Sequence, residues 1–360
     1  MAPVAEHDEL REVVRQVLAK HAGHEQVRSA AATERGWSEE LWQLLNAELE
    51  VAGMAVPEER GGSGYGVREL AVLLEEAGGA LLPEPLLASA VLGAQALAAA
   101  DSADEHRPLL DALVAGRSVA TVAPLRGPVA LRAERDGEAW LVSGVLPRVL
   151  QAGAADHLVC RAASERGEVL VVTGLAAARV EQLTVVDPTR RQARVSLERS
   201  PAALVVGTAR HDEVVERLAL LADVAVAAEH AGIVAHLLEA TCAYVVQREQ
   251  FGRPIGSFQA VKHRLADLLV DLERSRSAVR YAAAAMDADP VSAALPVAVA
   301  AAVCADAAVR TAHEAVQLHG GIGFTWEHFA HDYLRRVLGD EGLFGASRAQ
   351  RATVAELIGV

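Results

Sequence analysis

Arg248-Glu-Gln-Phe-Gly-Arg-Pro-Ile-Gly-Ser-Phe-Gln259 separates two stretches with helical patterns and decides how this part of the chain must fold. Two glycines and a proline within residues 251–256 exclude a helix or strand interior, because proline lacks a backbone donor and glycine is conformationally loose. Residues 237–246, before the stretch, have a helical pattern. Five apolar side chains after it share one helical face: Val261, Leu265, Leu268, Leu269 and Leu272. The stretch therefore predicts a sharp corner between two long antiparallel helices.

The charge balance excludes partners that need a positive surface. The chain has 34 Lys and Arg against 48 Asp and Glu, a formal net charge of −14. Nucleic acids and anionic membranes both bind positive surfaces, so neither is an expected partner. No uninterrupted apolar run reaches the roughly 18 residues of a membrane span, and the acidic amino terminus does not resemble a signal segment. We therefore expect a cytoplasmic protein without a membrane span.

The period of the apolar residues changes twice along the chain. Residues 117–208 alternate with period two between turn signals such as Asp136-Gly137, whereas the residues before and after them have helical spacing. We expect an α+β fold that is mainly α. It comprises an N-terminal helical domain (1–116), a middle antiparallel β domain (117–208) and a C-terminal four-helix bundle (209–360).

A second glycine-rich motif, Gln317-Leu-His-Gly-Gly-Ile-Gly-Phe324, follows the corner. The two motifs, in this order, resemble the carboxyl-terminal domain of the acyl-CoA dehydrogenases. Earlier in the chain, Val56-Pro-Glu-Glu-Arg-Gly-Gly-Ser-Gly-Tyr-Gly66 is similar to a segment of that family's first domain. The helix, β, helix order also matches, so the resemblance covers the whole chain.

The resemblance implies that FAD is the cofactor. In the family, the corner and the glycine-rich motif reach across a dimer interface to the FAD pyrophosphate and adenosine. Carried over, the contacting residues are Arg248, Phe251, Gln259, Gln317, Gly320 and Gly321. These residue types suit the task, because guanidinium pairs with phosphate and glycine lets the backbone approach it. The alternative is that the arginine caps a helix and the glycines only turn the chain.

The catalytic base of most acyl-CoA dehydrogenases is missing from its usual place. In that family a carboxylate removes the α-proton of a thioester and the flavin accepts the β-hydride. The usual base is the Glu of a Glu-Gly-Thr segment, which aligns here with Phe344-Gly345-Ala346. Phe cannot accept a proton. Asp340 and Glu341 lie nearby in the sequence, but Gly345 aligns well, so they are weak substitutes.

A minority of the family carries the base on the first long helix of this domain, at a position that falls on Ala222, next to Asp223. Glu229 follows roughly two turns later, on nearly the same expected face. Both carboxylates lie in an apolar stretch, which should raise their pKa values toward neutral pH. Asp223 and Glu229 are therefore the candidate bases. The alternatives are an exposed Asp and a Glu whose buried hydrogen bond holds the bundle together.

The β domain departs from the family in its flavin contacts. Val122-Ala-Pro-Leu-Arg-Gly127 and Arg148-Val-Leu-Gln151 stand where the family has segments whose hydroxyls and aromatic ring cover the flavin. Such divergent, short members resemble subunits of heteromeric bacterial steroid side-chain acyl-CoA dehydrogenases. In those enzymes a second, different subunit completes one FAD site.

The resemblance implies an FAD-dependent acyl-CoA dehydrogenase subunit that desaturates an acyl-CoA thioester at the α,β position. Electrons would leave to an electron-transfer flavoprotein, and the assembly would be a homo-oligomer or a heterotetramer with a second dehydrogenase-like subunit. The alternative is a catalytically silent partner that completes the FAD site of a heteromeric enzyme. A third possibility, an oxidase or a nitrogen-hydroxylating relative, shares the fold.

Two further sets of residues contain types that bind metals but lack the spacing of a metal site. His328, His331 and Asp332 could formally bind one, but no third or fourth ligand of suitable spacing accompanies the histidine pair. The three cysteines, Cys160, Cys242 and Cys304, lack metal or redox spacing. We therefore predict no metal site.

Overall fold

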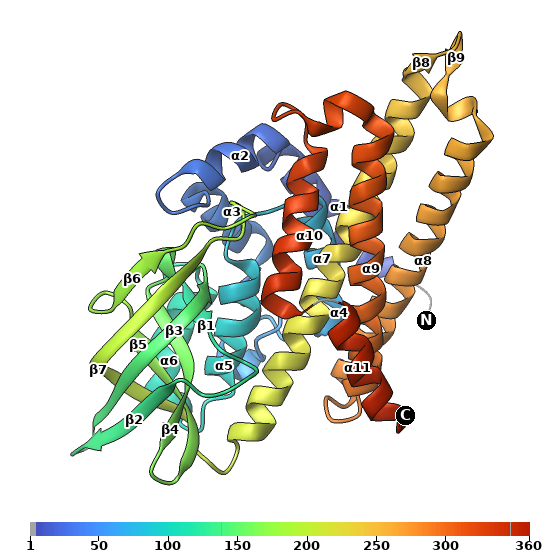
Figure 1. Cartoon of the computed structure of the whole chain (residues 1–360). Helices are drawn as coiled ribbons and strands as arrows, with labels where there is room; N and C mark the ends of the chain where they lie inside the picture. Colours follow the sequence, from blue (N-terminus) through green and yellow to red (C-terminus); the bar gives the residue numbers. More distant parts are fainter. Residues whose placement is uncertain (1–4, 138, 346) are drawn as a thin grey trace. The chain divides into compact units, whose positions relative to one another are not determined.

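A computed structural model of the chain describes residues 5–137, 139–345 and 347–360 (Figure 1). The chain forms two compact units. The first contains residues 1–28, 67–82 and 223–360, and the second contains residues 29–66 and 83–222.

The first unit consists almost entirely of helices. They are α1 (Ala5–His21), the start of α2 (His24–Ala32), α4 (Val67–Gly79), most of α7 (His211–Gln247), α8 (Gln259–Ala288), α9 (Ala294–His319), α10 (Ala330–Phe344) and α11 (Ser347–Ile358). Between α7 and α8 the chain turns through two short strands, β8 (Glu249–Gln250) and β9 (Arg253–Pro254). The corner expected from the sequence is therefore confirmed.

Two glycines bring helices α4 and α7 into backbone contact. A Cβ atom added to Gly78 would lie 2.2 Å from the carbonyl oxygen of Glu229, and one added to Gly232 would lie 1.7 Å from that of Glu75. Real side chains do not tolerate such distances, so only glycine fits at either position. Beside this crossing, the buried Glu75 carboxylate binds Arg276 at 2.8 Å and Arg11 at 3.1 Å. A carboxylate buried beside such a close helix contact is tolerated because basic side chains pair with it.

The second unit is built on a closed β barrel. Its strands are β1 (Ala120–Val122), β2 (Leu131–Asp136), β3 (Ala139–Leu150), β4 (His157–Ser164), β5 (Gly167–Gly174), β6 (Arg179–Gln182) and β7 (Gln192–Val206). The strand pairs β4–β2, β2–β3, β3–β7, β7–β5 and β5–β4 return to their starting point, so the sheet closes on itself. The hairpin expected at Asp136-Gly137 joins β2 and β3.

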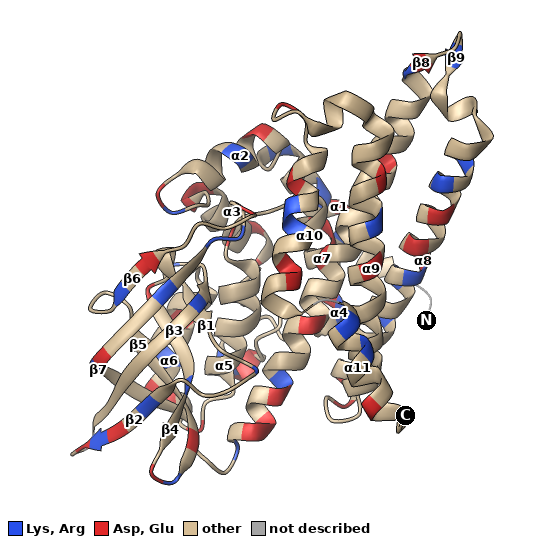
Figure 2. Cartoon of the chain, in the orientation of Figure 1, with Lys and Arg blue, Asp and Glu red and all other residues tan. Residues whose placement is uncertain are grey.

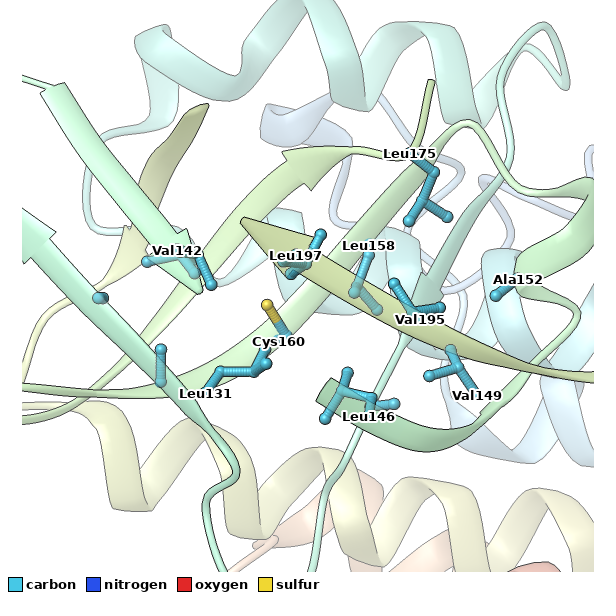
Figure 3. Close-up of a cluster of buried hydrophobic side chains, with 14 of the residues drawn as sticks. Leu131, Val142, Leu146, Val149, Ala152, Leu158, Cys160, Leu175, Val195 and Leu197 are labelled. Carbon is cyan, nitrogen blue, oxygen red and sulfur yellow. The ribbon is translucent and has the colours of Figure 1, made fainter. Parts of the chain in front are cut away.

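The barrel encloses an apolar core in which Leu131, Val142, Leu158, Cys160 and Val195 are buried (Figure 3). The remaining helices of this unit are α3 (Glu39–Leu49), the π-helix η2 (Leu86–Gly93), α5 (Ala94–Ala98) and α6 (Ala103–Val114). Alternation of apolar and polar residues along the strands explains the core, because successive side chains point to opposite faces. The helical, β and helical order of the fold is confirmed. The exact domain boundaries stay a prediction.

Two helical stretches are long and apolar enough to cross a membrane by length and composition: α7 and residues Ala294–Phe324. Within the 18-residue apolar window of α7, 94% is buried inside the protein. The corresponding window of the other stretch is 50% buried. The described chain also carries basic and acidic residues interspersed on both units (Figure 2). A helix that is apolar all round and buried is a core helix, and α7 fits that description.

Replacing Gly232 with Ala should destabilise the protein. Alanine favours a helix over glycine by about 1 kcal/mol, but the new methyl group would overlap the Glu75 backbone, and overpacking costs about 1–3 kcal/mol or more. We expect a net loss of at least about 1 kcal/mol in the free energy of unfolding. Chemical denaturation followed by circular dichroism measures it.

Gly174→Ala is the matched control, because a Cβ there meets no atom within 4 Å. If Gly232→Ala were as stable as this control, the close crossing of α4 and α7 would be wrong.

Candidate functional site

The corner motif forms an exposed tip on the first unit. Phe251 and Gly252 have positive φ angles of 56° and 75°, and the Ile255 amide donates to the Arg248 carbonyl at 2.8 Å. The Phe251 ring is 91% exposed. The Arg253 guanidinium lies 4.1 Å from the centre of the Phe258 ring. The tip therefore presents an aromatic ring and cations to its surroundings.

The glycine-rich motif lies at the same end of the unit as the corner. Helix α9 ends at His319, and the 3₁₀ turn η5 (Gly320–Phe324) follows. Tyr244, on the last turn of α7, donates its hydroxyl hydrogen to the His319 carbonyl at 3.2 Å, and the two rings lie 4.4 Å apart. Phe324, the last residue of the turn, is 81% exposed, and Trp326, just beyond it, is 68% exposed. Tyr244 thus holds the two motifs together.

All six residues predicted to contact the cofactor are exposed: Arg248, Phe251, Gln259, Gln317, Gly320 and Gly321. A Cβ atom on Gly320 or Gly321 would meet nothing within 4 Å, and Gly320 has a φ angle of 65°. Their backbone is therefore open to an approaching group. A guanidinium, an aromatic ring and open glycine backbone fit the phosphate and ring groups of FAD.

A cluster of histidine and aromatic rings lies beneath the glycine-rich turn. His319 Nδ1 donates to the Ala315 carbonyl at 2.7 Å, which leaves its Nε2 as the acceptor. Its ring lies 4.5 Å from that of His328, which stacks on Phe329 at 4.3 Å. His236 stacks on Tyr333 at 5.0 Å. The sequence analysis missed this cluster, since its members come from α7, α9 and α10 and share no spacing.

The His328 to Asp332 segment is held by hydrogen bonds and ion pairs. Asp332 contacts His24 Nε2 at 3.0 Å and His331 Nε2 at 3.2 Å. Among the described residues, no group of three or more His, Cys, Asp or Glu is arranged to hold a metal ion. The pKa of His328 is lowered to about 4. Burial is the largest cause, and the nearby His319, His331 and His24 add to it.

A small cavity lies between Asp223 and the segment that aligns with the family's usual base. It has a volume of about 20 Å³, room for about one water molecule. Its polar lining consists of Asp223, His230, Asp340, Glu341 and Gln350. Phe344 and Gly345, which align with the family's usual base segment, line the same cavity. Asp223 and the aligned segment Phe344-Gly345 therefore line one cavity.

His230 and Asp340 form a buried pair at this cavity. His230 Nε2 lies 3.1 Å from Asp340 Oδ2, and the side chains are 5% and 1% exposed. His230 comes seven residues after Asp223, two helical turns, so both point to the same side of α7. That spacing was the signal that could have identified His230 from the sequence.

Glu229 does not share this face. The expectation that it lies on nearly the same face as Asp223 is wrong, because six residues at 3.6 per turn rotate a side chain by about one and two-thirds turns. Glu229 is buried, but it does not line the cavity. Its backbone instead packs against Gly78 of α4.

The second unit holds another buried carboxylate, Glu84, which was not among the candidates from the sequence. Glu84 precedes the π-helix η2, and its Oε1 accepts a hydrogen bond from the Ser38 amide at 3.1 Å. Burial raises the pKa of Glu84 to about 7. Glu84 therefore changes charge near neutral pH.

Acid should weaken the histidine cluster. The pKa of His328 falls from 6.5 in the unfolded chain to about 4 in the folded protein, so the unfolded state takes up the proton first. This contribution to stability is present above pH 6.5 and is lost as the pH falls from there to about 4. His328→Gln should flatten the decline in the free energy of unfolding over this window, measured by denaturation at several pH values.

His263→Gln, an exposed histidine on α8, serves as the control and should leave the wild-type decline unchanged. An identical pH dependence in wild type and His328→Gln would remove His328 as the acid-sensitive group.

Two family models match most of the chain. The acyl-CoA dehydrogenase C-terminal domain matches residues 216–359, and the acyl-CoA dehydrogenase N-terminal domain matches residues 4–117. Acyl-CoA dehydrogenase IpdE2 of Mycobacterium tuberculosis is 37% identical, over 97% of this chain and 96% of that protein. Acyl-CoA dehydrogenase FadE34 of the same organism is 38% identical, over 84% of this chain and 40% of that protein.

Solved structures agree with these matches. The ChsE4-ChsE5 complex of Mycobacterium tuberculosis has a chain with a TM-score of 0.91 and 28% identity, over 99% of this chain and 98% of that chain. A variant of the Tcur3481-Tcur3483 steroid ACAD has a TM-score of 0.88 and 30% identity, over 98% of both chains. The resemblance and the fold class expected from the sequence are confirmed, and the chain belongs to the acyl-CoA dehydrogenase family.

Proposed function

We propose that this chain is a subunit of an FAD-dependent oxidoreductase that desaturates an acyl-CoA thioester at the α,β position. The observation that carries the proposal is the pairing of the corner and glycine-rich motifs at one end of the first unit, joined by Tyr244 and His319. This pairing supports a cofactor contact made by Arg248, Phe251 and Gly320. When bound, FAD supplies the hydride acceptor.

Asp223 is the proposed proton acceptor. Its side chain is 3% exposed and lines the cavity that Phe344 and Gly345 also line. A carboxylate is the residue type that removes the α-proton in this family, and Asp223 supplies one at the cavity. Glu229, the other candidate from the sequence, does not line this cavity and ranks second.

The substrate and the assembly are proposed from the relatives. Two structural neighbours are described as a complex of two different chains and as a steroid dehydrogenase. We therefore propose a steroid-derived acyl-CoA substrate, a heterotetramer with a second dehydrogenase-like subunit, and a cytoplasmic location. The homo-oligomer remains the alternative assembly. An electron-transfer flavoprotein is the proposed electron acceptor.

A catalytically silent role is the second candidate. The observation that favours it is the occupation of the family's base position by Phe344, together with the engagement of the neighbouring Asp340 by His230. In this reading the chain supplies Arg248 and the glycine-rich turn to a flavin, and the other subunit removes the proton.

Asp223→Asn should reduce turnover by about 10²–10⁴-fold, the usual contribution of a general base, while flavin content and native mass stay unchanged. Steady-state kinetics of the purified assembly measure it. Glu229→Gln should keep turnover within about tenfold of wild type. The opposite ranking would move the base to Glu229, and full turnover in both variants would favour the silent partner.

Arg248→Ala should lower the flavin retained after purification, because a charged hydrogen bond to phosphate contributes about 1.5–3 kcal/mol. The visible absorption spectrum and native mass, for the chain alone and with its partner, measure this loss. Arg274→Ala is the control, since this exposed arginine lies about four helical turns beyond Gln259 on α8. Equal flavin content in both variants would exclude Arg248 as a cofactor contact.

A further inference from the structure

The closed barrel of the second unit has an open mouth at one end. A cavity of about 850 Å³ lies where the β2–β3 and β4–β5 hairpins meet the end of β7. Its apolar walls are Ala133, Trp140, Val169 and Leu204. Trp140 and Leu204 pack against the barrel core and remain half-buried. The mouth therefore offers apolar surface within a cavity of the size that small molecules occupy, about 300–1,000 Å³.

Three arginines stand around this mouth: Arg132, Arg135 and Arg166. All three are exposed. In the described part of the chain, no carboxylate lies within ion-pair distance of the Arg132 or Arg166 guanidinium. Unpaired cations at a cavity are notable in a chain with a net charge of −14.

One arginine outside the cavity pairs with two of the acidic residues near the mouth. Arg199, which does not line the cavity, lies 3.7 Å from Glu134 and 3.1 Å from Asp136. Glu165 is the remaining carboxylate among the described lining residues. Counted together with Arg199, four arginines stand against the three carboxylates of Glu134, Asp136 and Glu165, so the formal charge around the mouth is positive and the mouth attracts anions.

One of the arginines is already arranged as a stacking surface. The Arg135 guanidinium lies 4.7 Å from the centre of the Trp140 ring, and the two residues are directly opposite on β2 and β3. A guanidinium held on an indole is a flat, rigid surface on which a planar ring can stack. Arg132 and Arg166 remain available for oxygens of phosphate, which arginine binds in a bidentate manner.

We propose that the mouth of the barrel binds a nucleoside diphosphate, with its base against the Arg135 and Trp140 pair and its phosphates on Arg132 and Arg166. The site lies wholly in the second unit, whereas the cofactor residues around Arg248 lie in the first. A free nucleotide and the nucleotide end of coenzyme A share this chemistry, and the experiment below separates them.

The test is calorimetric titration of the purified full-length protein, with its partner where one is needed, using ADP, coenzyme A and inorganic pyrophosphate as separate probes. ADP should bind to wild type, and Arg132→Ala and Arg166→Ala should each weaken binding by about tenfold or more. Arg194→Ala is the matched control, because this exposed arginine of β7 does not line the cavity. Glu165→Gln should strengthen binding, which a variant that merely damages the barrel would not do.

Each outcome supports the proposal, overturns it, or identifies which ligand the mouth binds. Equal binding to wild type, Arg132→Ala and Arg166→Ala, or no ADP or coenzyme A binding to wild type, would overturn it. Pyrophosphate binding as tight as that of ADP would refute the stacking contact. Binding of coenzyme A but not ADP would assign the mouth to the nucleotide end of coenzyme A.

Arg248→Ala separates this site from the cofactor site. It should leave ADP binding at the mouth unchanged even where it lowers flavin content. Loss of ADP binding in that variant would place the nucleotide at the cofactor motifs and overturn the mouth site, whereas failure of the flavin prediction alone would leave it standing.

Discussion

The backbone contact between α4 and α7 at Gly78 and Gly232 is the constraint on which the first unit depends. Helices that touch through glycine leave no space for water between them, so a nearby polar group must find partners in the protein. Glu75 does so through Arg11 and Arg276, which come from α1 and α8. Removing one partner of such a buried group costs far more than the pair contributes. The crossing and its ion pairs therefore fix three other helices around α4.

A fixed α7 determines which of its side chains can do chemistry. Asp223 and His230 occupy one face and line the same small cavity, whereas Glu229 lies against α4. Tyr244, at the far end of the helix, contacts His319 and sets the glycine-rich turn beside the corner. One helix thus positions both the candidate proton acceptor and the surface proposed to contact FAD.

Local signals in the sequence sufficed for part of this arrangement. The glycines and proline of residues 251–256 predicted the corner, and the change of period predicted the β region, because both effects act over a few residues. The pairing of His230 with Asp340 joins residues far apart in the chain, so no spacing in the sequence predicts it. The barrel mouth depends in the same way on the pairings of β2 with β4 and of β7 with β3 and β5. The error over Glu229 came from treating six residues as two turns, whereas seven residues complete them.

The exposed end of the first unit also bears on how this protein is made in a cell. Phe251, Phe324 and Trp326 are each more than two-thirds exposed, and they lie on or directly after the two motifs that Tyr244 and His319 join. Large exposed aromatic groups favour association with any apolar surface available. A newly synthesised chain would therefore depend on prompt capture by whatever covers this end. The rate at which this end is covered, rather than the stability of the isolated fold, would then set how much protein accumulates.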